Sequence, residues 1–238
     1  IKSYKGGSDE NWIQGFYNGR YDWTHANALQ PEVDNAGNLN KIYLSSRHLS
    51  RITKIAYPSG EVIWKMGLPA EYNTGSENIC TDLLFSFQHH VQILDNGDLL
   101  LFDNGRLSKM LLGDSSSTSR VLRIRVIDNS DCEIVWQYDL PQNLYGASMG
   151  SAQLLENGNY FIYTTGSGGD NVEGDNVENT IIEVTPEKEI IYKAVIPVTR
   201  GMVYRAYKIP SIFPSTTPTP APTTSNQKIQ LAISNNRS

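Results

Sequence analysis

The chain has 238 residues, of which 39% are hydrophobic and 19% charged, and its formal net charge is -5 at pH 7. This apolar share suffices for one large packed domain, whereas the negative charge and the lack of a basic stripe argue against nucleic-acid binding. No apolar run approaches the about 20 residues that a membrane-spanning helix needs, so we expect no membrane span.

The sequence begins at Ile1 without a visible signal peptide, so we expect the start of the gene product to lie upstream or to have been removed. Residues 1–21 mix Trp12, Phe16 and Tyr17 with glycine and charged residues. We interpret this segment as a loop between structural units or as the tail of an earlier unit.

From residue 22 onward, short apolar or alternating runs are separated by Asn-Gly, Asp-Asn-Gly and Pro-Ser-Gly turns. Such punctuation is typical of antiparallel strands joined by tight turns, and helical periodicity is nearly absent. When the turns are aligned, three units of four strands each superimpose, over residues 22–66, 87–140 and 148–197. Residues 201–213 would begin a further unit, with Val203–Ile209 as its first strand.

Four strands repeated about every 60 residues predict an all-β fold of the β-propeller type, in which each four-stranded sheet is one blade. The chain holds about three to three and a half blades, whereas natural propellers have about four to eight. We therefore interpret residues 1–213 as a partial propeller and the chain as an internal piece of a larger protein. Residues 214–226, rich in Pro, Thr and Ser, are expected to form an extended linker, and residues 227–238 to begin a further, truncated segment.

Aromatic residues close the three units at equivalent positions, each after a pair of Val or Ile residues. We expect Trp64, Trp136 and Tyr192 to pack between blades, where a fully buried side chain stabilises the fold by about 1.5–3 kcal/mol. The two cysteines, Cys80 and Cys132, either form one disulfide or remain free thiols, and their spacing is not that of metal ligands.

Three polar stretches favour structural interpretations. Asp114–Ser119 is expected to be a flexible surface excursion with nothing to bury. The alternation of Arg120, Arg123 and Arg125 is expected on a strand with one solvated face. The acidic stretch 167–178 has oxygen ligands for calcium but lacks the spacing of a known calcium loop, so we expect a solvated loop.

Other polar residues fall at equivalent places in the repeat. His25 and His89 lie at the entry to the first strand of consecutive units, Gly150 takes that place in the third, and Arg47 ends the second strand of its unit. Because first strands line the central channel of a propeller, these side chains are expected to meet there. Asn27, two residues after His25, would share its strand face.

The remaining two histidines are expected to have structural roles. His48 follows Arg47 and His90 follows His89, so strand alternation would point each of them to the opposite face. For the same reason the adjacent pair His89 and His90 cannot aim at one ion, and we expect no metal site.

The ordered set of motifs from about residue 20 to residue 213 resembles the arylsulfotransferase family, also called aryl-sulfate sulfotransferases. The motifs are Asp22-Trp23-Thr24-His25-Ala26-Asn27, Leu44-Ser45-Ser46-Arg47-His48, Gln88-His89, Asp95-Asn96-Gly97-Asp98, Glu156-Asn157-Gly158-Asn159 and Glu183-Val184-Thr185-Pro186. The resemblance implies a six-bladed propeller that moves a sulfuryl group from a phenolic sulfate ester to another phenol. It also implies a ping-pong mechanism through a sulfohistidine, without a nucleotide donor.

The resemblance further implies roles for individual residues. His89, which follows Gln88, matches the nucleophile, whereas His25 and Arg47 match donor-binding and acid/base positions and Asn27 matches a sulfate contact. Two weaker matches to substrate-binding positions lie in the later units, at Thr165 and Tyr204. The family also has a further active-site histidine in an earlier blade, which this sequence does not contain.

The chemistry by itself asks for these residue types. Sulfuryl transfer places charge on the sulfate oxygens and on the departing phenolate, which need fixed donors and a proton source. Arg47, planar and permanently charged, suits the sulfate oxygens, and a neutral imidazole at His89 is a competent nucleophile near pH 7. His25 would polarise or protonate the phenolic oxygen, a task worth about 10²–10⁴ in rate.

We expect an aryl sulfotransferase whose partners are a small aryl sulfate donor and a phenol acceptor, with no cofactor. The alternative is a propeller of the same fold that binds ligands or proteins without catalysis. A quinone-binding propeller is disfavoured, because no cofactor-stacking tryptophan motif is present. The resemblance and the Pro/Thr-rich linker favour a secreted protein, either extracellular or periplasmic.

Overall fold

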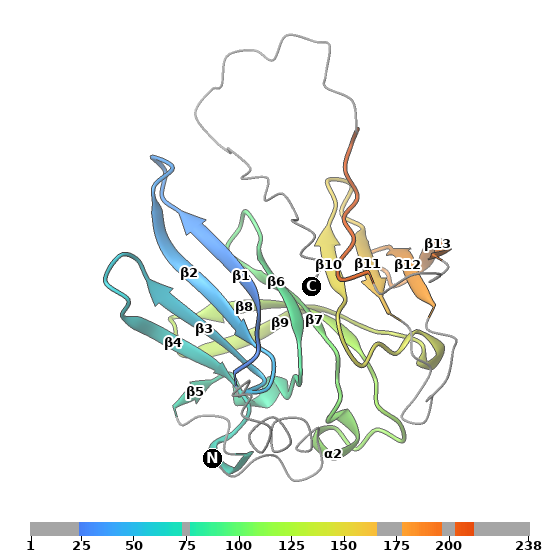
Figure 1. Ribbon diagram of the computed structural model, residues 1–238, viewed down its shortest axis with the longest axis horizontal. Coiled ribbons are helices and arrows are strands. Elements are labelled where there is room, and N and C mark those ends of the chain that lie inside the picture. Colours follow the sequence, from blue (N-terminus) through green and yellow to red (C-terminus); the bar gives the residue numbers. More distant parts are fainter. Residues whose placement is uncertain (1–23, 73–76, 166–177, 197–202, 212–238) are drawn as a thin grey trace, which may run out of the picture.

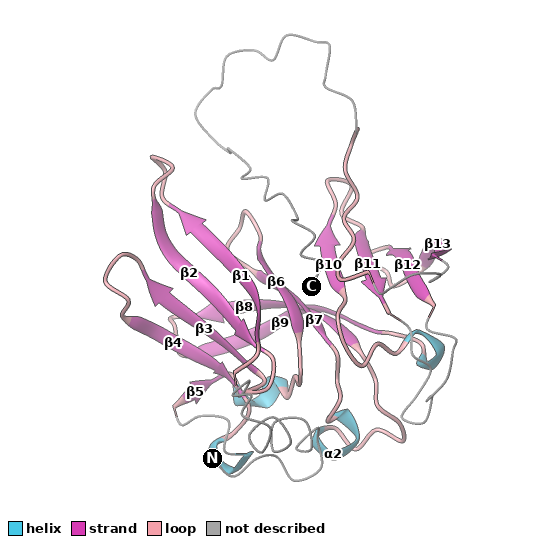
Figure 2. Ribbon diagram, in the orientation of Figure 1, coloured by secondary structure: helices cyan, strands magenta, loops and turns pink. Residues whose placement is uncertain are grey.

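The structure of the protein is a computed structural model in which residues 24–72, 77–165, 178–196 and 203–211 are described. These residues form three sheets and very little helix (Figure 1, Figure 2). The all-β prediction is therefore confirmed. None of the described helices has the length and apolar character needed to cross a membrane.

Each sheet is an antiparallel meander of four consecutive strands, and the first sheet adds a fifth strand in parallel. The first sheet contains β1 (Ala26–Val33), β2 (Leu39–Ser46), β3 (Arg51–Ala56), β4 (Val62–Gly67) and β5 (Asn78–Ile79). The second contains β6 (His89–Ile93), β7 (Leu99–Asp103), β8 (Arg120–Ile127) and β9 (Asp131–Asp139). The third contains β10 (Ser151–Leu154), β11 (Tyr160–Thr164), β12 (Asn179–Val184) and β13 (Ile190–Ile196). Short helical segments are η1 (Ala70–Tyr72), η2 (Thr81–Leu83), α2 (Ser108–Leu111) and η3 (Gln142–Leu144).

The turn that joins the first two strands is the same in every sheet. It holds a glycine in the left-handed region, whose N–H donates to the carbonyl three residues earlier. These glycines are Gly37, Gly97 and Gly158, with φ of 83°, 86° and 87°. Glycine adopts this conformation without a steric penalty, so the turn signals of the sequence, Asn35-Ala36-Gly37, Asn96-Gly97 and Asn157-Gly158, correctly locate all three turns.

The three sheets are arranged as blades of a partial β-propeller, with the first strand of each on the inside. Figure 1 shows β1, β6 and β10 side by side, and the middle strand, β6, contacts both β1 and β10 across the sheets. Apolar side chains fill the space between consecutive blades in two clusters, one between the first and second sheets and one between the second and third. Each blade thus buries its faces only against its neighbours.

Two of the three closing aromatic residues pack as predicted. Trp64 is buried between the first two blades, with its ring edge-on to Tyr43 at 5.7 Å. Trp136 stacks on Tyr160 of the third blade at 3.6 Å and donates its Nε1–H to the carbonyl of Pro186. The prediction is wrong for Tyr192 on β13, which is 52% exposed because, among the described residues, no further sheet packs against the third one.

Cys80 and Cys132 form a disulfide, which settles the two alternatives left by the sequence. Cys80 lies between β5 and η2, and Cys132 lies on β9 of the second blade. The bond spans 52 residues of sequence, so it ties the first blade covalently to the second.

The expected flexible excursion Asp114–Ser119 is in fact bound to the fold. Ser117 and Ser119 are 2% and 0% exposed, and Ser119 Oγ accepts the N–H of Gly146 at 3.0 Å. The expectation failed because serine hydroxyls satisfy backbone groups of neighbouring loops, which composition alone does not reveal.

The segment Val203–Ile209 does not form the expected strand, although it runs beside β10. Its backbone is bound by side chains: Ser151 Oγ donates to Ala206 O at 2.9 Å, and Gln153 Nε2 donates to Lys208 O at 3.1 Å. Side-chain amides and hydroxyls therefore replace the backbone ladder between this segment and the third blade.

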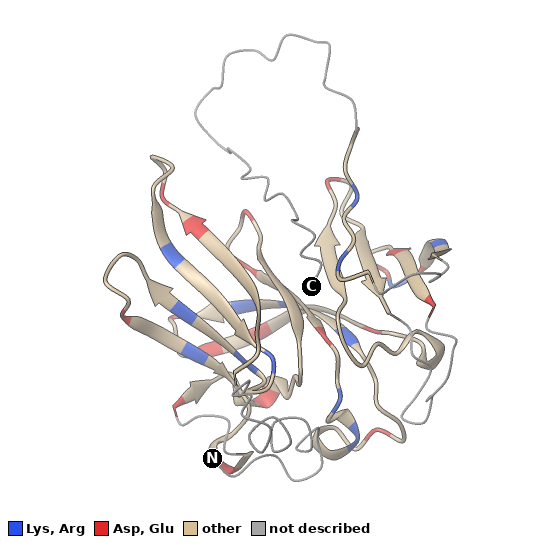
Figure 3. Cartoon of the chain, in the orientation of Figure 1, with Lys and Arg blue, Asp and Glu red and all other residues tan. Residues whose placement is uncertain are grey.

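Charged residues of both signs are interspersed over the three sheets (Figure 3). The arginines of β8 do not share one solvated face: Arg120 is 5% exposed, whereas Arg123 and Arg125 bind the buried carboxylate of Asp98. The predictions for residues 1–21, for 167–177 of the acidic stretch and for the segments after residue 213 lie outside the described residues.

Candidate functional site

The predicted site residues gather at one end of the inner strands. His25 immediately precedes β1 and Arg47 immediately follows β2, while His89 opens β6 and Thr165 follows β11. In an antiparallel hairpin the start of the first strand lies beside the end of the second. The inner strands of the three blades run side by side, so these positions meet at the same end of the molecule (Figure 1).

His89 is the most buried ionisable group among them, at 3% exposure. Burial lowers the pKa of its imidazole to about 3, and the nearby charges of Arg47 and His25 lower it further. Hydrogen bonds to Asn104 and to the backbone of Phe87 offset part of this shift. At neutral pH the ring is therefore uncharged and keeps a lone pair on one nitrogen, which is what a nucleophile or a proton acceptor requires.

Asn104 is the partner of His89 that the sequence interpretation missed. Its Oδ1 lies 2.7 Å from Nδ1 of His89, and both side chains are buried. Asn104 follows β7, the strand that pairs with β6, so the contact is made by the antiparallel register of the hairpin. The signal in the sequence was a polar residue directly after the second strand of the unit, the same place that Arg47 has in the first unit. It was missed because Asp103-Asn104-Gly105 resembles an ordinary turn.

Arg47 places its charge against an aromatic ring. Its guanidinium carbon lies 5.0 Å from the ring centre of Phe87, and the residue is 7% exposed. The backbone N–H of Arg47 donates to the carbonyl of His25 at 3.0 Å. The guanidinium of Arg106 lies 5.4 Å from the same ring. Two arginines thus contact one buried phenylalanine two residues before His89, a favourable cation–π arrangement that sets positive charge near the nucleophile candidate.

His48 belongs to this group, contrary to the prediction that it points away. The rings of His25 and His48 are 4.6 Å apart, and His48 also lies 6.1 Å from Phe87. Strand alternation does not apply here, because β2 ends at Ser46 and residues after it form a turn. The two imidazoles therefore lie side by side.

Asn27 lies on a β-bulge, so it does not share a strand face with His25. The register of β1 against β2 shifts between Ala26 and Ala28, which makes Asn27 the extra residue, and His25 itself has a φ of 47°. The side-chain Nδ2 of Asn27 donates to the carbonyl of Gln88 at 2.7 Å. One amide hydrogen of Asn27 is therefore engaged in joining the first blade to the second.

A matching bulge in the second blade corrects the repeat alignment. The register of β6 shifts between His89 and Val91, so His90 occupies the place that Asn27 has in the first blade. The equivalence of His25 and His89 is thus wrong by one residue: His89 is the counterpart of Ala26. Beyond the bulge, β1 and β6 contain different numbers of residues. An alignment that relies on the turns alone does not detect the bulge or this difference in length.

His90 points away from His89 because of this bulge rather than by simple alternation. Its φ is 56°, its ring lies 5.7 Å from that of Tyr207, and the N–H of Ala152 lies 3.5 Å from its Nδ1. Burial lowers the pKa of His90 to about 3, with a smaller effect from the charge of Arg205. It is a neutral packing residue between the second blade and the third.

Tyr204 and Thr165, the two weaker matches to substrate-binding positions, make different contacts around the site. The ring of Tyr204 is edge-on to that of His89 at 6.0 Å, and its hydroxyl donates to the carbonyl of Asn27 at 3.1 Å. Thr165 is 3% exposed and donates to the carbonyl of Ser148 at 2.8 Å. Tyr204 therefore contacts the candidate nucleophile directly, whereas Thr165 supports the loop before β10.

Gly150, the position that the sequence repeat assigned to the third blade, has no room for a side chain, and by strand register the counterpart of His89 is Ser151. Gly150 has a φ of 108°, and a Cβ at this position would lie 2.6 Å from the ring of Phe102. The aromatic ring of the second blade thus occupies the space that a side chain would need. Among the described residues, no group of three or more His, Cys, Asp or Glu is arranged to hold a metal ion.

The chain is similar in sequence to one protein family. The family described as Arylsulfotransferase (ASST) matches residues 9–205. No curated protein matches the chain in sequence.

Several solved structures are similar at low identity. A protein of unknown function from Bacteroides caccae shares 16% identity with a TM-score of 0.46, over 76% of this chain and 54% of that chain. Virginiamycin B lyase from Staphylococcus aureus shares 14% identity with a TM-score of 0.33, over 71% of this chain and 55% of that chain. A streptogramin B lyase shares 13% identity with a TM-score of 0.28, over 74% of this chain and 70% of that chain. The chain thus spans about half the length of the first two.

Proposed function

Because the chain belongs to the arylsulfotransferase family, we propose that it contributes the nucleophile to the transfer of a sulfuryl group from an aryl sulfate ester to a phenol. The nucleophile is His89, and the donor is the aryl ester itself rather than a nucleotide. The observation that carries the proposal is a buried, uncharged imidazole at His89 with Arg47 and His25 close enough to lower its pKa. This combination supplies a lone pair and positive charge within one site.

The first half-reaction forms a sulfohistidine. The imidazole lone pair of His89 attacks the sulfur atom, a nitrogen–sulfur bond forms, and the bond between sulfur and the aryl oxygen breaks. The aryl oxygen leaves with the electron pair of that bond and takes a proton from a neighbouring acid, for which His25 is the candidate. The imidazole ring becomes cationic and carries the sulfuryl group.

The second half-reaction returns His89 to its starting form. The oxygen of the acceptor phenol attacks the same sulfur, the nitrogen–sulfur bond breaks, and its electron pair goes back to the imidazole. The phenol proton passes to the group that protonated the first leaving group. The enzyme gains and loses one sulfuryl group and one proton per cycle, so no oxidant or nucleotide is consumed.

The neighbouring residues have distinct parts in this proposal. Arg47, held against Phe87, neutralises the sulfate oxygens as charge shifts in the transition state. The ring of His48 contacts that of His25 at a tilt of 37° and keeps it in place. Tyr204 lies edge-on to the His89 ring. We assign Asn27 and Thr165 to the substrate-binding group through the backbone that they fix, at Gln88 and Ser148.

The test uses the full-length protein with a chromogenic aryl sulfate and a phenol acceptor between pH 6 and pH 9. We expect release of the coloured phenol that depends on the acceptor. Without acceptor, intact-mass analysis should show the addition of one sulfuryl group, and peptide mapping should place it on His89. His89→Asn should abolish both signals.

The exposed residue Asn143, in η3, provides a control, since Asn143→Ala should leave turnover unchanged. Retained transfer in a folded His89→Asn protein would remove His89 as the nucleophile. Absence of phenol release from the wild-type protein at every pH would defeat the enzyme proposal and leave ligand or protein binding without catalysis as the function.

We also propose that the protein works outside the cytoplasm, in a secreted or periplasmic location. The support is the disulfide between Cys80 and Cys132, since such bonds persist in oxidising compartments. Fractionation of cells that express the full-length protein, with a cytoplasmic marker enzyme as control, tests this location.

A further inference from the structure

The orientation of the Asn104 side chain is fixed by its hydrogen bonds. Its Nδ2 donates to the carbonyl of Gly146 at 2.7 Å and to the carbonyl of Met149 at 2.9 Å. Carbonyl oxygens only accept, so the amide nitrogen must face them and Oδ1 must face His89. A flipped amide would set its oxygen against two carbonyl oxygens and leave all three without a donor.

This orientation determines which ring nitrogen of His89 carries the proton. Oδ1 of Asn104 is an acceptor and lies 2.7 Å from Nδ1 of His89, so Nδ1 must be the donor. In a neutral imidazole only one nitrogen carries hydrogen, and the other keeps the lone pair.

We propose that Asn104 is the positioning residue of His89: it holds the imidazole in the Nδ1-protonated tautomer and leaves the lone pair on Nε2. Under the proposed function, on which this part rests, Nε2 is the atom that attacks sulfur. Asn104 does not touch the substrate, and it acts through His89 alone.

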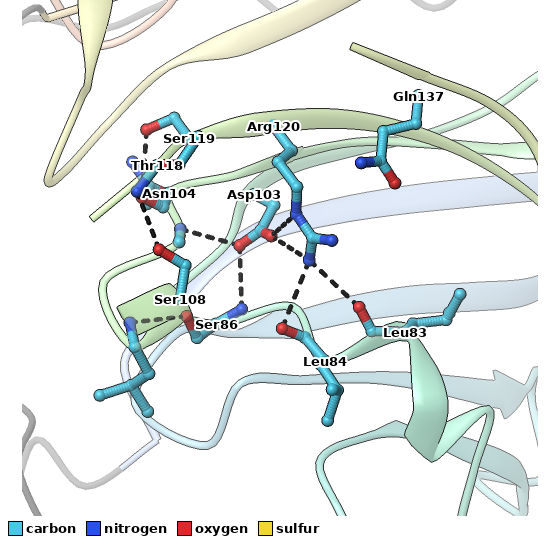
Figure 4. A network of polar contacts seen from close by, with 12 residues as sticks. Leu83, Leu84, Ser86, Asp103, Asn104, Ser108, Thr118, Ser119, Arg120 and Gln137 are labelled. Atoms are coloured by element: carbon cyan, nitrogen blue, oxygen red, sulfur yellow. Dashed lines mark hydrogen bonds and ion pairs between the residues drawn. The ribbon is translucent and has the colours of Figure 1, made fainter. Parts of the chain in front are cut away.

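The turn that carries Asn104 is held rigidly on the side of Asp103. Asp103 Oδ1 accepts the N–H groups of Ser86 and Gly105 at 2.9 and 2.8 Å. Arg120 donates to Asp103 Oδ2 from Nε and Nη2, at 2.9 and 2.7 Å (Figure 4). These bonds fix the side chain of Asp103, the residue before Asn104, in one orientation.

The other side of the turn is fixed by the close approach of Gly105 to Thr118 and by hydrogen bonds of Ser119. Gly105 has a φ of 61°, and a Cβ on it would lie 1.8 Å from the carbonyl oxygen of Thr118. Ser119 Oγ donates to the carbonyl oxygen of Asn104 at 3.1 Å (Figure 4). It also accepts the N–H of Gly146. Asn104 thus joins the second blade to the loop before β10, and the same contacts that fix its amide define the geometry around His89.

The direct test is the tautomer of His89, read by long-range ¹H–¹⁵N correlation spectra of the full-length protein labelled at histidine. The signals of His89 are assigned as those lost in His89→Asn. We expect Nδ1 to carry the proton in the wild-type protein. In Asn104→Leu, which removes the acceptor, the Nδ1-protonated signal should be lost or mixed with the other tautomer.

Two further variants serve as controls for Asn104→Leu. Asn104→Asp retains an acceptor oxygen and should retain the Nδ1-protonated signal, although the carbonyls of Gly146 and Met149 lose their donor. Asn143→Ala, in the exposed part of η3, should change neither the spectrum nor the rate. In Asn104→Leu we expect kcat for sulfuryl transfer to fall about 10²-fold, with a smaller change in KM, because the nucleophile loses its orientation.

The spectra decide the proposal without requiring turnover. An Nε2-protonated His89 in the wild-type protein would overturn it, and so would an unchanged tautomer in folded Asn104→Leu. Loss of the Nδ1-protonated signal in that variant supports the positioning role, even if the wild-type protein transfers no sulfuryl group. In that last case only the proposed function fails.

Discussion

Arg120 binds Asp103 with two donors inside the second blade, and its Nη2 also reaches the carbonyls of Leu83 and Leu84 at 3.1 and 3.3 Å. The side chains of Arg120 and Asp103 are 6% and 0% exposed. This buried ion pair connects the segment before β6 to the turn after β7. The site therefore depends on a group that has no part in the chemistry.

Replacing Arg120 by methionine should destabilise the protein strongly. The carboxylate of Asp103 would remain buried without its cation, which typically costs about 3–5 kcal/mol of unfolding free energy. Urea denaturation followed by circular dichroism measures the loss. Lys65→Ala is the matched control, because its pair with Glu77 is on the surface and should contribute less than about 1 kcal/mol. Equal effects of the two substitutions would contradict the special role of the buried pair.

Gly105→Ala should be far more harmful than Gly97→Ala. Both glycines have positive φ, which disfavours alanine by about 1–2 kcal/mol. Only at Gly105 does the added Cβ meet a backbone atom, the carbonyl oxygen of Thr118, whereas nothing lies within 4 Å at Gly97. Thermal unfolding of the two variants should separate these costs, and the tautomer spectrum of His89 should change only in Gly105→Ala. Similar melting temperatures for both variants would show that the turn after β7 yields more easily than its contacts indicate.

Removing the disulfide should loosen the contact between the first two blades. Cys80 and Cys132 are 52 positions apart in the sequence, and a disulfide that closes a loop of this length commonly stabilises a protein by about 2–4 kcal/mol. The double variant Cys80→Ser/Cys132→Ser should unfold at lower urea than the wild-type protein. A reductant should bring the wild-type protein to the same midpoint and leave the variant unchanged; an effect of reductant on the variant would point to another cause.

Acid should destabilise the fold through the two buried imidazoles of His89 and His90. Their pKa values are about 3 in the folded protein, below the usual 6.5. Between these values the unfolded chain binds protons that the folded chain does not. The unfolding free energy therefore falls as the pH drops from 6.5 toward 3, by at most about 1.4 kcal/mol per pH unit for each histidine.

His90→Gln isolates one of these contributions, because glutamine does not titrate. Urea denaturation at several pH values between 4 and 7 measures how the unfolding free energy changes with pH. In His90→Gln this slope should be smaller than in the wild-type protein, because nearly one proton fewer is taken up on unfolding. An unchanged slope would mean that His90 is protonated in the folded state, contrary to its burial.

The repeat and its turns were predictable because they depend on local chemistry. The Asn- and Gly-containing turns place glycine where φ is positive, and the apolar runs between them mark strands, of which β7 and β11 are buried along their whole length. His89, His25 and Arg47 were also predictable as a group, since each lies at a strand end set by these turns. The predictions failed where strand alternation was applied to residues outside regular strands, as for His48 after β2 and Asn27 in the bulge of β1.

The sequence by itself thus determined the four-stranded unit, its repetition and the histidines at one end of it, because turn preference and apolar pattern act over a few residues. Only the tertiary structure decided which side chains face each other: the bulge that separates His89 from His90, and the placement of Asn104 against Nδ1 of His89. These contacts follow from strand register and from packing between blades. Such features depend on residues far apart in the chain, so no local pattern encodes them.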